Sequence, residues 1–208
     1  MELRAAGLKE QPFRSSERPL VFFAYAGQQK AFEFFDQTSQ HNTGLGLFQG
    51  PHLSGKTTLI AQYAEARADD LAIAIVDADG LNKTAFLEAL LAAFGYEHQF
   101  DCYNELLNMV TVFIKHQTAA GRPPLLFVEN IHMMNPSTQN ALCELACVRV
   151  REKYALRILL CSDRSIDYIA NAPAMESIAK RLTGNFHLEP LTIDETSDYL
   201  YAKLRQGG

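Results

Sequence analysis

Apolar residues follow two periodicities along this chain, one typical of helices and one typical of buried strands. Apolar side chains that recur every three or four positions predict helices over residues 27–40, 57–68, 83–94, 103–119 and 137–153. Two further helices are expected near the C-terminus, one that begins near Ala174 and one that begins at a capping box over 192–195. Short runs that are apolar throughout predict strands at residues 45–48, 71–76, 125–128, 158–161 and 186–188.

The alternation of apolar strands with helices predicts an α/β fold, in which helices cover both faces of a parallel sheet. About five strands are expected, in one domain over residues 1–208 that opens with an irregular segment at 1–20. Ligands of open α/β sheets bind at the carboxyl ends of the strands, so we expect the chemistry at that edge. Polar residues follow four of the predicted strands, namely Gly50, Asp77, Glu129 and Ser162.

The composition is that of a globular protein, with 48% hydrophobic and 21% charged residues. A formal net charge of −5 argues against nucleic acid as a partner. The N-terminus lacks the apolar core of a signal peptide, and no run of 18 apolar residues forms a membrane segment. The four cysteines are expected to be buried, reduced thiols. These features together predict a cytoplasmic location.

The segment after the first predicted strand matches a phosphate-binding loop. Residues 50–57 spell G-P-H-L-S-G-K-T, which fits G-x-x-x-x-G-K-[ST] at every specified position. Its two glycines allow main-chain amides to surround an anion, and the helix that follows adds its positive end. Lys56 is expected to reach the β- and γ-phosphates, and Thr57 to bind Mg²⁺. The residues predicted to bind ATP are Gly50, Pro51, His52, Leu53, Ser54, Gly55, Lys56, Thr57 and Thr58.

A second candidate feature follows the third predicted strand, where Glu129 and Asn130 stand next to each other. An acidic residue at such a position usually holds Mg²⁺, so we assign that role to Glu129 together with Thr57. Many ATPases carry a second carboxylate at the next position, where it polarises the attacking water. Asn130 cannot accept a proton, although its amide can orient a water. We therefore predict tight nucleotide binding with weak hydrolysis; alternatively, both residues merely end a strand.

Two more residues are candidates for a part in catalysis. Ser162 is placed to sense the γ-phosphate or to position water, or else it belongs to a strand-end turn. Arg181 is a candidate arginine finger toward a neighbouring subunit, or else an exposed basic residue. An aromatic stripe is expected to form core, with one or two rings free to pack beside adenine. It consists of Phe22, Phe23, Tyr25, Phe32, Phe34 and Phe35.

Motifs outside the phosphate loop make the chain similar to a known family. Residues 6–13 spell A-G-L-K-E-Q-P-F, residues 53–59 spell L-S-G-K-T-T-L, and residues 129–132 spell E-N-I-H. Near the C-terminus, L-E-P-L at 188–191 precedes E-T-S-D-Y-L at 195–200. With these motifs the chain resembles the AAA+ ATPases of the ExeA/GspA type from about residue 6 onward. The resemblance implies a P-loop NTPase core with ATP and Mg²⁺ as cofactors.

The resemblance also implies a cellular setting. Members of that family act in bacterial envelope machinery for secretion or pilus assembly, and several continue into a transmembrane helix and a peptidoglycan-binding domain. DamX-like cell-division proteins pair a related ATPase with a SPOR domain. A protein partner in such machinery, or self-association, is therefore expected, with the chain as the cytoplasmic part of an inner-membrane protein. The chain departs from the family pattern in two respects. Asn130 occupies the position of the catalytic glutamate, and the helical lid is absent or truncated.

Three functions follow as hypotheses. The first is an ATP-binding AAA+ domain of low ATPase activity that serves a cell-envelope protein. The second is a degenerate P-loop scaffold that keeps the fold for protein contacts without significant hydrolysis. The third is a DNA-transposition ATPase of the TniB/TnsC kind, against which the acidic net charge argues. The intact Lys56 and Thr57 favour the first hypothesis, and Asn130 favours the second.

Overall fold

The structure of the protein is a computed structural model that describes residues 25–96, 102–165 and 175–207. The irregular segment predicted at 1–20, the first motif of the family resemblance, and the two phenylalanines at the start of the aromatic stripe lie outside the described residues. So does Ala174, the expected start of the helix before the fifth strand.

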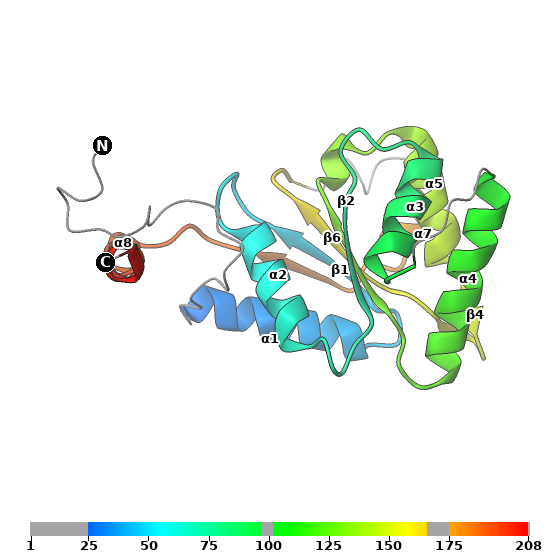
Figure 1. Ribbon diagram of the computed structural model, residues 1–208, viewed down its shortest axis with the longest axis horizontal. Coiled ribbons are helices and arrows are strands. Elements are labelled where there is room, and N and C mark those ends of the chain that lie inside the picture. Colours follow the sequence, from blue (N-terminus) through cyan, green and yellow to red (C-terminus); the bar gives the residue numbers. More distant parts are fainter. Residues whose placement is uncertain (1–24, 97–101, 166–174, 208) are drawn as a thin grey trace.

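One five-stranded sheet with the order β2-β3-β6-β1-β7 runs through the molecule, and every neighbouring pair in it is parallel. Figure 1 shows it between two layers of helices. This arrangement confirms the predicted α/β architecture. The strands are β1 (Leu45–Gln49), β2 (Ile73–Asp77), β3 (Leu125–Glu129), β6 (Arg157–Ser162) and β7 (Gly184–His187).

The helices divide between the two faces of the sheet (Figure 1). One face is covered by α1 (Ala26–Gln40) and α2 (Lys56–Ala66). The other is covered by α3 (Lys83–Ala93), α4 (Tyr103–Ala119), α5 (Pro136–Ala146) and the short α7 (Glu176–Ala179). Some helix boundaries follow local sequence signals. For example, the Asn82 side chain accepts hydrogen bonds from the amides of Thr84 and Ala85 and so caps α3.

Side chains of each central strand alternate between two hydrophobic clusters, one on each face. Leu126 and Val128 of β3 point toward α3, α4 and α5, whereas Phe127 of the same strand packs against α1 and α2. Strands β1, β3 and β6 are buried almost throughout, as predicted for strands covered on both faces. The edge strands β2 and β7 instead alternate between more and less buried residues. The prediction of uniformly buried strands is therefore wrong for the edges.

The helix predicted over 137–153 is shorter in the structure, because α5 ends at Ala146. The chain then forms a small antiparallel hairpin from β4 (Arg149–Val150) and β5 (Lys153–Tyr154). Arg151 and Glu152 form its turn with positive φ angles of 47° and 64°. A two-residue turn of this kind normally uses Asn or Gly, so the sequence gives no ordinary signal for it. The cysteine prediction is also corrected, since Cys102 and Cys147 are exposed.

Arg181 is buried at the end of the sheet opposite the phosphate loop, with only 3% of its surface exposed. Its guanidinium lies 4.2 Å from the centre of the Tyr154 ring, and burial lowers its pKa to about 10. It donates hydrogen bonds to four main-chain carbonyls, those of Thr43, Gly44, Ala146 and Leu156. The predictions of an arginine finger and of an exposed basic residue are therefore both wrong. Arg181 ties β1 and β6 to the end of α5.

Replacing Arg181 by methionine is expected to lower the free energy of unfolding by about 3 kcal/mol or more, because four main-chain carbonyls, three of them in buried hydrogen bonds, lose their charged donor. The quantity to measure is the midpoint of urea denaturation, followed by circular dichroism. Lys180→Met is the matched control, because Lys180 is a solvent-exposed neighbour. An unchanged midpoint for Arg181→Met would contradict the structural role.

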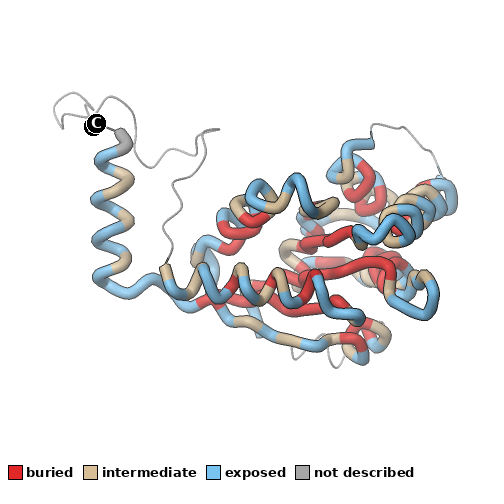
Figure 2. Tube along the Cα trace, turned by 90° about the horizontal axis from the view of Figure 1, so that it is seen from below, coloured by how far each residue is buried: buried red, intermediate tan, exposed pale blue. Residues whose placement is uncertain are grey.

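The last helix, α8 (Ile193–Gly207), extends away from the sheet, as Figure 2 shows. The predicted capping box is confirmed: Glu195 accepts a hydrogen bond from the Thr192 amide at 2.9 Å, and the Glu195 amide donates to Thr192 Oγ1 at 3.2 Å. The Tyr25 hydroxyl, just before α1, donates to the Glu195 carbonyl and so links the two helices. Among the described helices, none combines the length and apolar character that crossing a bilayer requires.

Candidate functional site

The phosphate loop connects β1 to α2 at the carboxyl edge of the sheet, as predicted. Gly50 directly follows β1, and its amide donates to the Ser162 carbonyl of β6. A β-carbon at Gly50 would lie 2.8 Å from the Leu188 carbonyl oxygen, so only glycine fits there. Gly55 adopts a φ of 90°, a conformation that favours glycine, and α2 begins at the next residue. The loop therefore directs the N-terminus of α2 toward the site, where it favours an anion.

The ammonium group of Lys56 is buried within the loop and has three partners. Its Nζ donates to the carbonyls of Gly50 and Pro51, at 2.9 Å each. It also forms an ion pair with Asp163 Oδ1 at 2.6 Å. Since an ammonium group has three N–H donors, these contacts use all of them.

Asp163 is a site residue that the sequence analysis left without a role. It follows β6, and its second carboxylate oxygen lies 3.0 Å from Nδ1 of His52. Burial opposes ionisation of Asp163, but hydrogen bonds from Lys56 and His52 outweigh it and lower the pKa of the carboxyl group. The His52 imidazole thus contacts a residue of the site. One signal in the sequence could have identified Asp163. It is an acidic residue just past the predicted strand at 158–161, and the same kind of position was used to select Glu129.

Thr57 and Glu129 come together across the carboxyl edge, as predicted for a metal-binding pair. The Thr57 hydroxyl donates to Glu129 Oε1 at 2.5 Å. Burial raises the pKa of Glu129, although the hydrogen bond from Thr57 opposes this shift. The described residues contain no cluster of three or more His, Cys, Asp or Glu side chains suited to a metal. Two oxygen donors fit Mg²⁺, which in nucleotide sites takes its other ligands from phosphates and water.

Asn130 has a partner on the neighbouring strand. Its side-chain Nδ2 donates to Asp77 Oδ1 at 2.9 Å, where Asp77 ends β2 in register with Glu129. The φ angle of Asn130 is 52°, in the left-handed region that asparagine tolerates better than most residues. Because the amide nitrogen faces Asp77, the Asn130 oxygen is left to accept a hydrogen bond from another group. The pair places an amide just after β3 and a carboxylate at the end of β2.

Ser162 lies at the end of β6 but is buried, with 1% of its surface exposed. Its hydroxyl accepts a hydrogen bond from the Arg164 amide and donates to the Arg164 carbonyl. It also lies 3.5 Å from Nδ1 of His132. These contacts fit the strand-end turn, the second of the two roles predicted for Ser162. At this end of β6, the side chain of Asp163 faces the phosphate loop instead.

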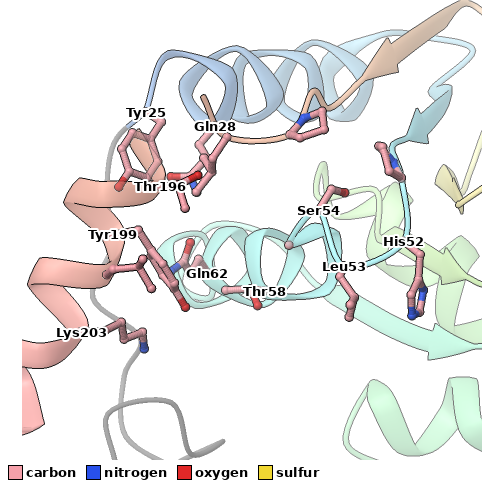
Figure 3. A pocket seen from close by; sticks show the side chains of 15 residues that line it. Tyr25, Gln28, His52, Leu53, Ser54, Thr58, Gln62, Thr196, Tyr199 and Lys203 are labelled. Atoms are coloured by element: carbon pink, nitrogen blue, oxygen red, sulfur yellow. The ribbon is translucent and has the colours of Figure 1, made fainter. Parts of the chain in front are cut away.

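Two adjoining cavities surround the loop. The first has a volume of about 420 Å³ and is lined by Lys56, Thr57, Glu129, Asn130 and Asp163, among others. The second has a volume of about 470 Å³ and extends from the loop to α1 and α8. Its labelled lining residues, which Figure 3 shows between these elements, are Tyr25, Gln28, His52, Leu53, Ser54, Thr58, Gln62, Thr196, Tyr199 and Lys203.

Three polar atoms among the residues that line the second cavity are buried without a hydrogen-bond partner in the described part of the chain. They are Gln28 Oε1, Ser54 Oγ and Gln62 Oε1. Buried polar groups are normally satisfied, so these three unpaired atoms distinguish this cavity. Tyr25 from the aromatic stripe lines the same cavity, whereas Phe35 is fully buried in the core. The sequence singled out neither glutamine, because each lies on a helix without a motif.

Comparisons with known proteins agree with this geometry. The family model described as "AAA domain" matches residues 39–169. General secretion pathway protein A from Aeromonas hydrophila is 23% identical over 203 residues, which cover 97% of this chain and 37% of that protein. The chain therefore spans little more than a third of the length of this relative. These matches confirm the resemblance to the ExeA/GspA type.

Solved structures share the fold. The ADP form of the Aeropyrum pernix ORC2 protein superimposes with a TM-score of 0.72 at 16% identity, over 96% of this chain and 57% of that one. Cdc6p from Pyrobaculum aerophilum superimposes with a TM-score of 0.65 at 14% identity, over 93% of this chain and 52% of that one. The Aeropyrum pernix ORC1 protein in complex with DNA superimposes with a TM-score of 0.64 at 14% identity, over 94% of this chain and 52% of that one. At such identities the likeness establishes the fold alone.

Proposed function

The chain belongs to the AAA domain family, and from that premise we propose that it binds ATP with Mg²⁺ and hydrolyses it slowly. The observation that carries this proposal is the convergence of Lys56, Thr57 and Glu129 on one cavity at the end of the phosphate loop. Membership of the family supports a nucleotide-binding module. The identity of the nucleotide, the metal and the rate of hydrolysis are parts of the proposal.

Each residue of the loop region has a distinct task in this proposal. Free main-chain amides of the loop and the N-terminus of α2 would surround the phosphates, while Lys56 would neutralise their charge. Thr57 and Glu129 would hold Mg²⁺, which supplies further neutralisation of the phosphate oxygens when bound. The second cavity would take the base and ribose, with Tyr25 as a packing surface and Gln28 and Gln62 as hydrogen-bonding groups.

Slow hydrolysis is expected because the side chain at position 130 is an amide, that of Asn130, and not a carboxylate. The Asn130 amide can orient a water through its oxygen, because Asp77 fixes its nitrogen on the other side. It cannot accept the proton that this water must lose. A general base typically contributes a factor of about 10²–10⁴ to a rate, so its absence favours a long-lived ATP complex.

The test measures two quantities on the same protein, the steady-state rate of ATP turnover and the affinity for ATP. We expect ATP to bind and turnover to remain below roughly 1 s⁻¹, under the usual range for enzymes. Release of phosphate at a faster rate would contradict the proposal of slow hydrolysis and a long-lived ATP complex. Binding without any detectable turnover would favour the degenerate scaffold.

We further propose a place for this module in the bacterial cell envelope. The support is the likeness to General secretion pathway protein A, which covers nearly all of this chain. A protein partner in secretion, pilus or cell-division machinery, or self-association, and a cytoplasmic location are parts of this proposal. A nucleic-acid partner is not proposed, because the net charge of −5 gives no general attraction to phosphate backbones. ATP-dependent retention of DNA would overturn that choice in favour of a transposition-type ATPase.

A further inference from the structure

Lys56 has no N–H donor left for an incoming phosphate. Two of its three donors bind carbonyls of the loop, and the third binds the Asp163 carboxylate. A phosphate can therefore reach the ammonium group only by replacing one of these partners. The two carbonyls belong to residues 50 and 51 of the loop itself, so their positions are set by the fold of the loop.

Asp163 is the partner that resembles a phosphate. Its carboxylate is an anion with oxygen acceptors, and it approaches Lys56 from β6, outside the loop. It lines the same cavity as Thr57 and Glu129, where the outer phosphates belong in the proposed nucleotide site. Asp163 also lies within hydrogen-bonding distance of His52, so one carboxylate connects β6 to two residues of the loop.

We propose that Asp163 holds the place of a nucleotide phosphate on Lys56, and that an incoming phosphate must displace it. This inference rests on the proposed nucleotide site and adds a residue that sets its affinity. The Asp163 carboxylate keeps the buried ammonium group paired until nucleotide arrives. Binding then exchanges one charge-assisted hydrogen bond for another, so the net gain from Lys56 is smaller than in a loop whose lysine is free. Asp163 can keep His52 as its partner after the exchange.

The test replaces Asp163 by asparagine, which preserves the size of the side chain and an oxygen acceptor but removes the charge. Titration calorimetry with ADP–Mg²⁺ and with ATP–Mg²⁺ should show binding tighter by about tenfold in Asp163→Asn than in the wild type, the scale of one charge-assisted hydrogen bond. Glu105→Gln is the matched control, because it removes one negative charge from an exposed position on α4. Asp163→Glu retains the competing anion, so its affinity should stay near that of the wild type.

The outcomes separate this inference from the proposed function. If the wild type binds nucleotide and Asp163→Asn binds with equal or lower affinity, Asp163 is no competitor and the inference is wrong while the nucleotide site stands. If neither protein binds ADP or ATP, the inference about Asp163 and the proposed nucleotide-binding function are both wrong. If the wild type binds too weakly to detect and Asp163→Asn binds measurably, the competition is supported in its strongest form.

A second measurement covers the case in which Asp163→Asn does not fold. Carbon-13 NMR of the aspartate carboxyl groups in the wild type follows Asp163 directly. Its pKa is lowered by Lys56 and His52, with burial acting in the opposite direction. It should rise when ADP–Mg²⁺ binds, because Lys56 leaves and a phosphate anion comes near. A pKa that stays unchanged on saturation with ADP would show that the ion pair survives, and the inference would be overturned.

Discussion

Replacing Lys56 by alanine is expected to weaken ATP binding by roughly 100-fold, the largest loss from any single change in the phosphate loop. The ammonium group lies inside the loop and is directed by two loop carbonyls toward the cavity that Thr57 and Glu129 also line. An alanine leaves the loop amides and the positive end of α2 in place but removes the full charge opposite the phosphates. The measurement is calorimetric titration with ATP–Mg²⁺.

Lys115→Ala is the control for this substitution. Lys115 is an exposed lysine of α4 on the other face of the sheet, so its loss changes the net charge equally without altering the site. Circular dichroism and thermal unfolding establish that both variants fold. An affinity of Lys56→Ala within about twofold of the wild type would show that Lys56 does not engage phosphate.

Asn130→Glu combined with Asp77→Asn is expected to raise ATP turnover by about 10²-fold or more, the contribution of a general base. Asn130→Glu alone would set a new carboxylate against Asp77, which now accepts the Asn130 amide at 2.9 Å. Like charges at such a distance repel and hinder ionisation of the new acid. Exchanging the two chemical groups keeps one amide and one carboxylate between β2 and β3. It places the carboxylate on the residue that lines the phosphate cavity.

The double variant is measured by steady-state phosphate release at saturating ATP–Mg²⁺. Glutamate at position 130 must adopt a positive φ, which costs roughly 1–2 kcal/mol, so a lower unfolding temperature is expected alongside the faster turnover. Asp77→Asn alone is the control and should leave turnover at the wild-type level. A folded double variant that binds ATP but turns it over no faster than the wild type would show that position 130 is not where a base is missing.

The parts of the fold that could be predicted from the sequence are those set by local pattern. Runs that are apolar throughout identified the central strands, because both of their faces are buried, and Gly50, Gly55 and Lys56 identified the phosphate loop by spacing alone. Capping signals also located helix starts, as with the box formed by Thr192 and Glu195.

The missed features depend on contacts between distant segments. Arg181 is separated from the Thr43 carbonyl by 138 positions, and a lone arginine in a sequence carries no sign that it will be buried. Asp163 meets Lys56 only because β6 and β1 are neighbours in the sheet. Spacing in the sequence cannot show that strand order directly. The hairpin after α5 was missed because Arg151 and Glu152 are unusual turn residues at positive φ.

Titration of the wild-type chain with ATP–Mg²⁺ shows whether this AAA domain binds ATP through its phosphate loop. Calorimetry should give a single saturable site per chain with a dissociation constant in roughly the micromolar range, about −8 kcal/mol of binding free energy. Absence of saturable heat from a folded sample, up to roughly millimolar ATP, would show that the loop does not bind ATP. The fold would then serve as a scaffold, and Lys56, Thr57 and Glu129 would need another explanation.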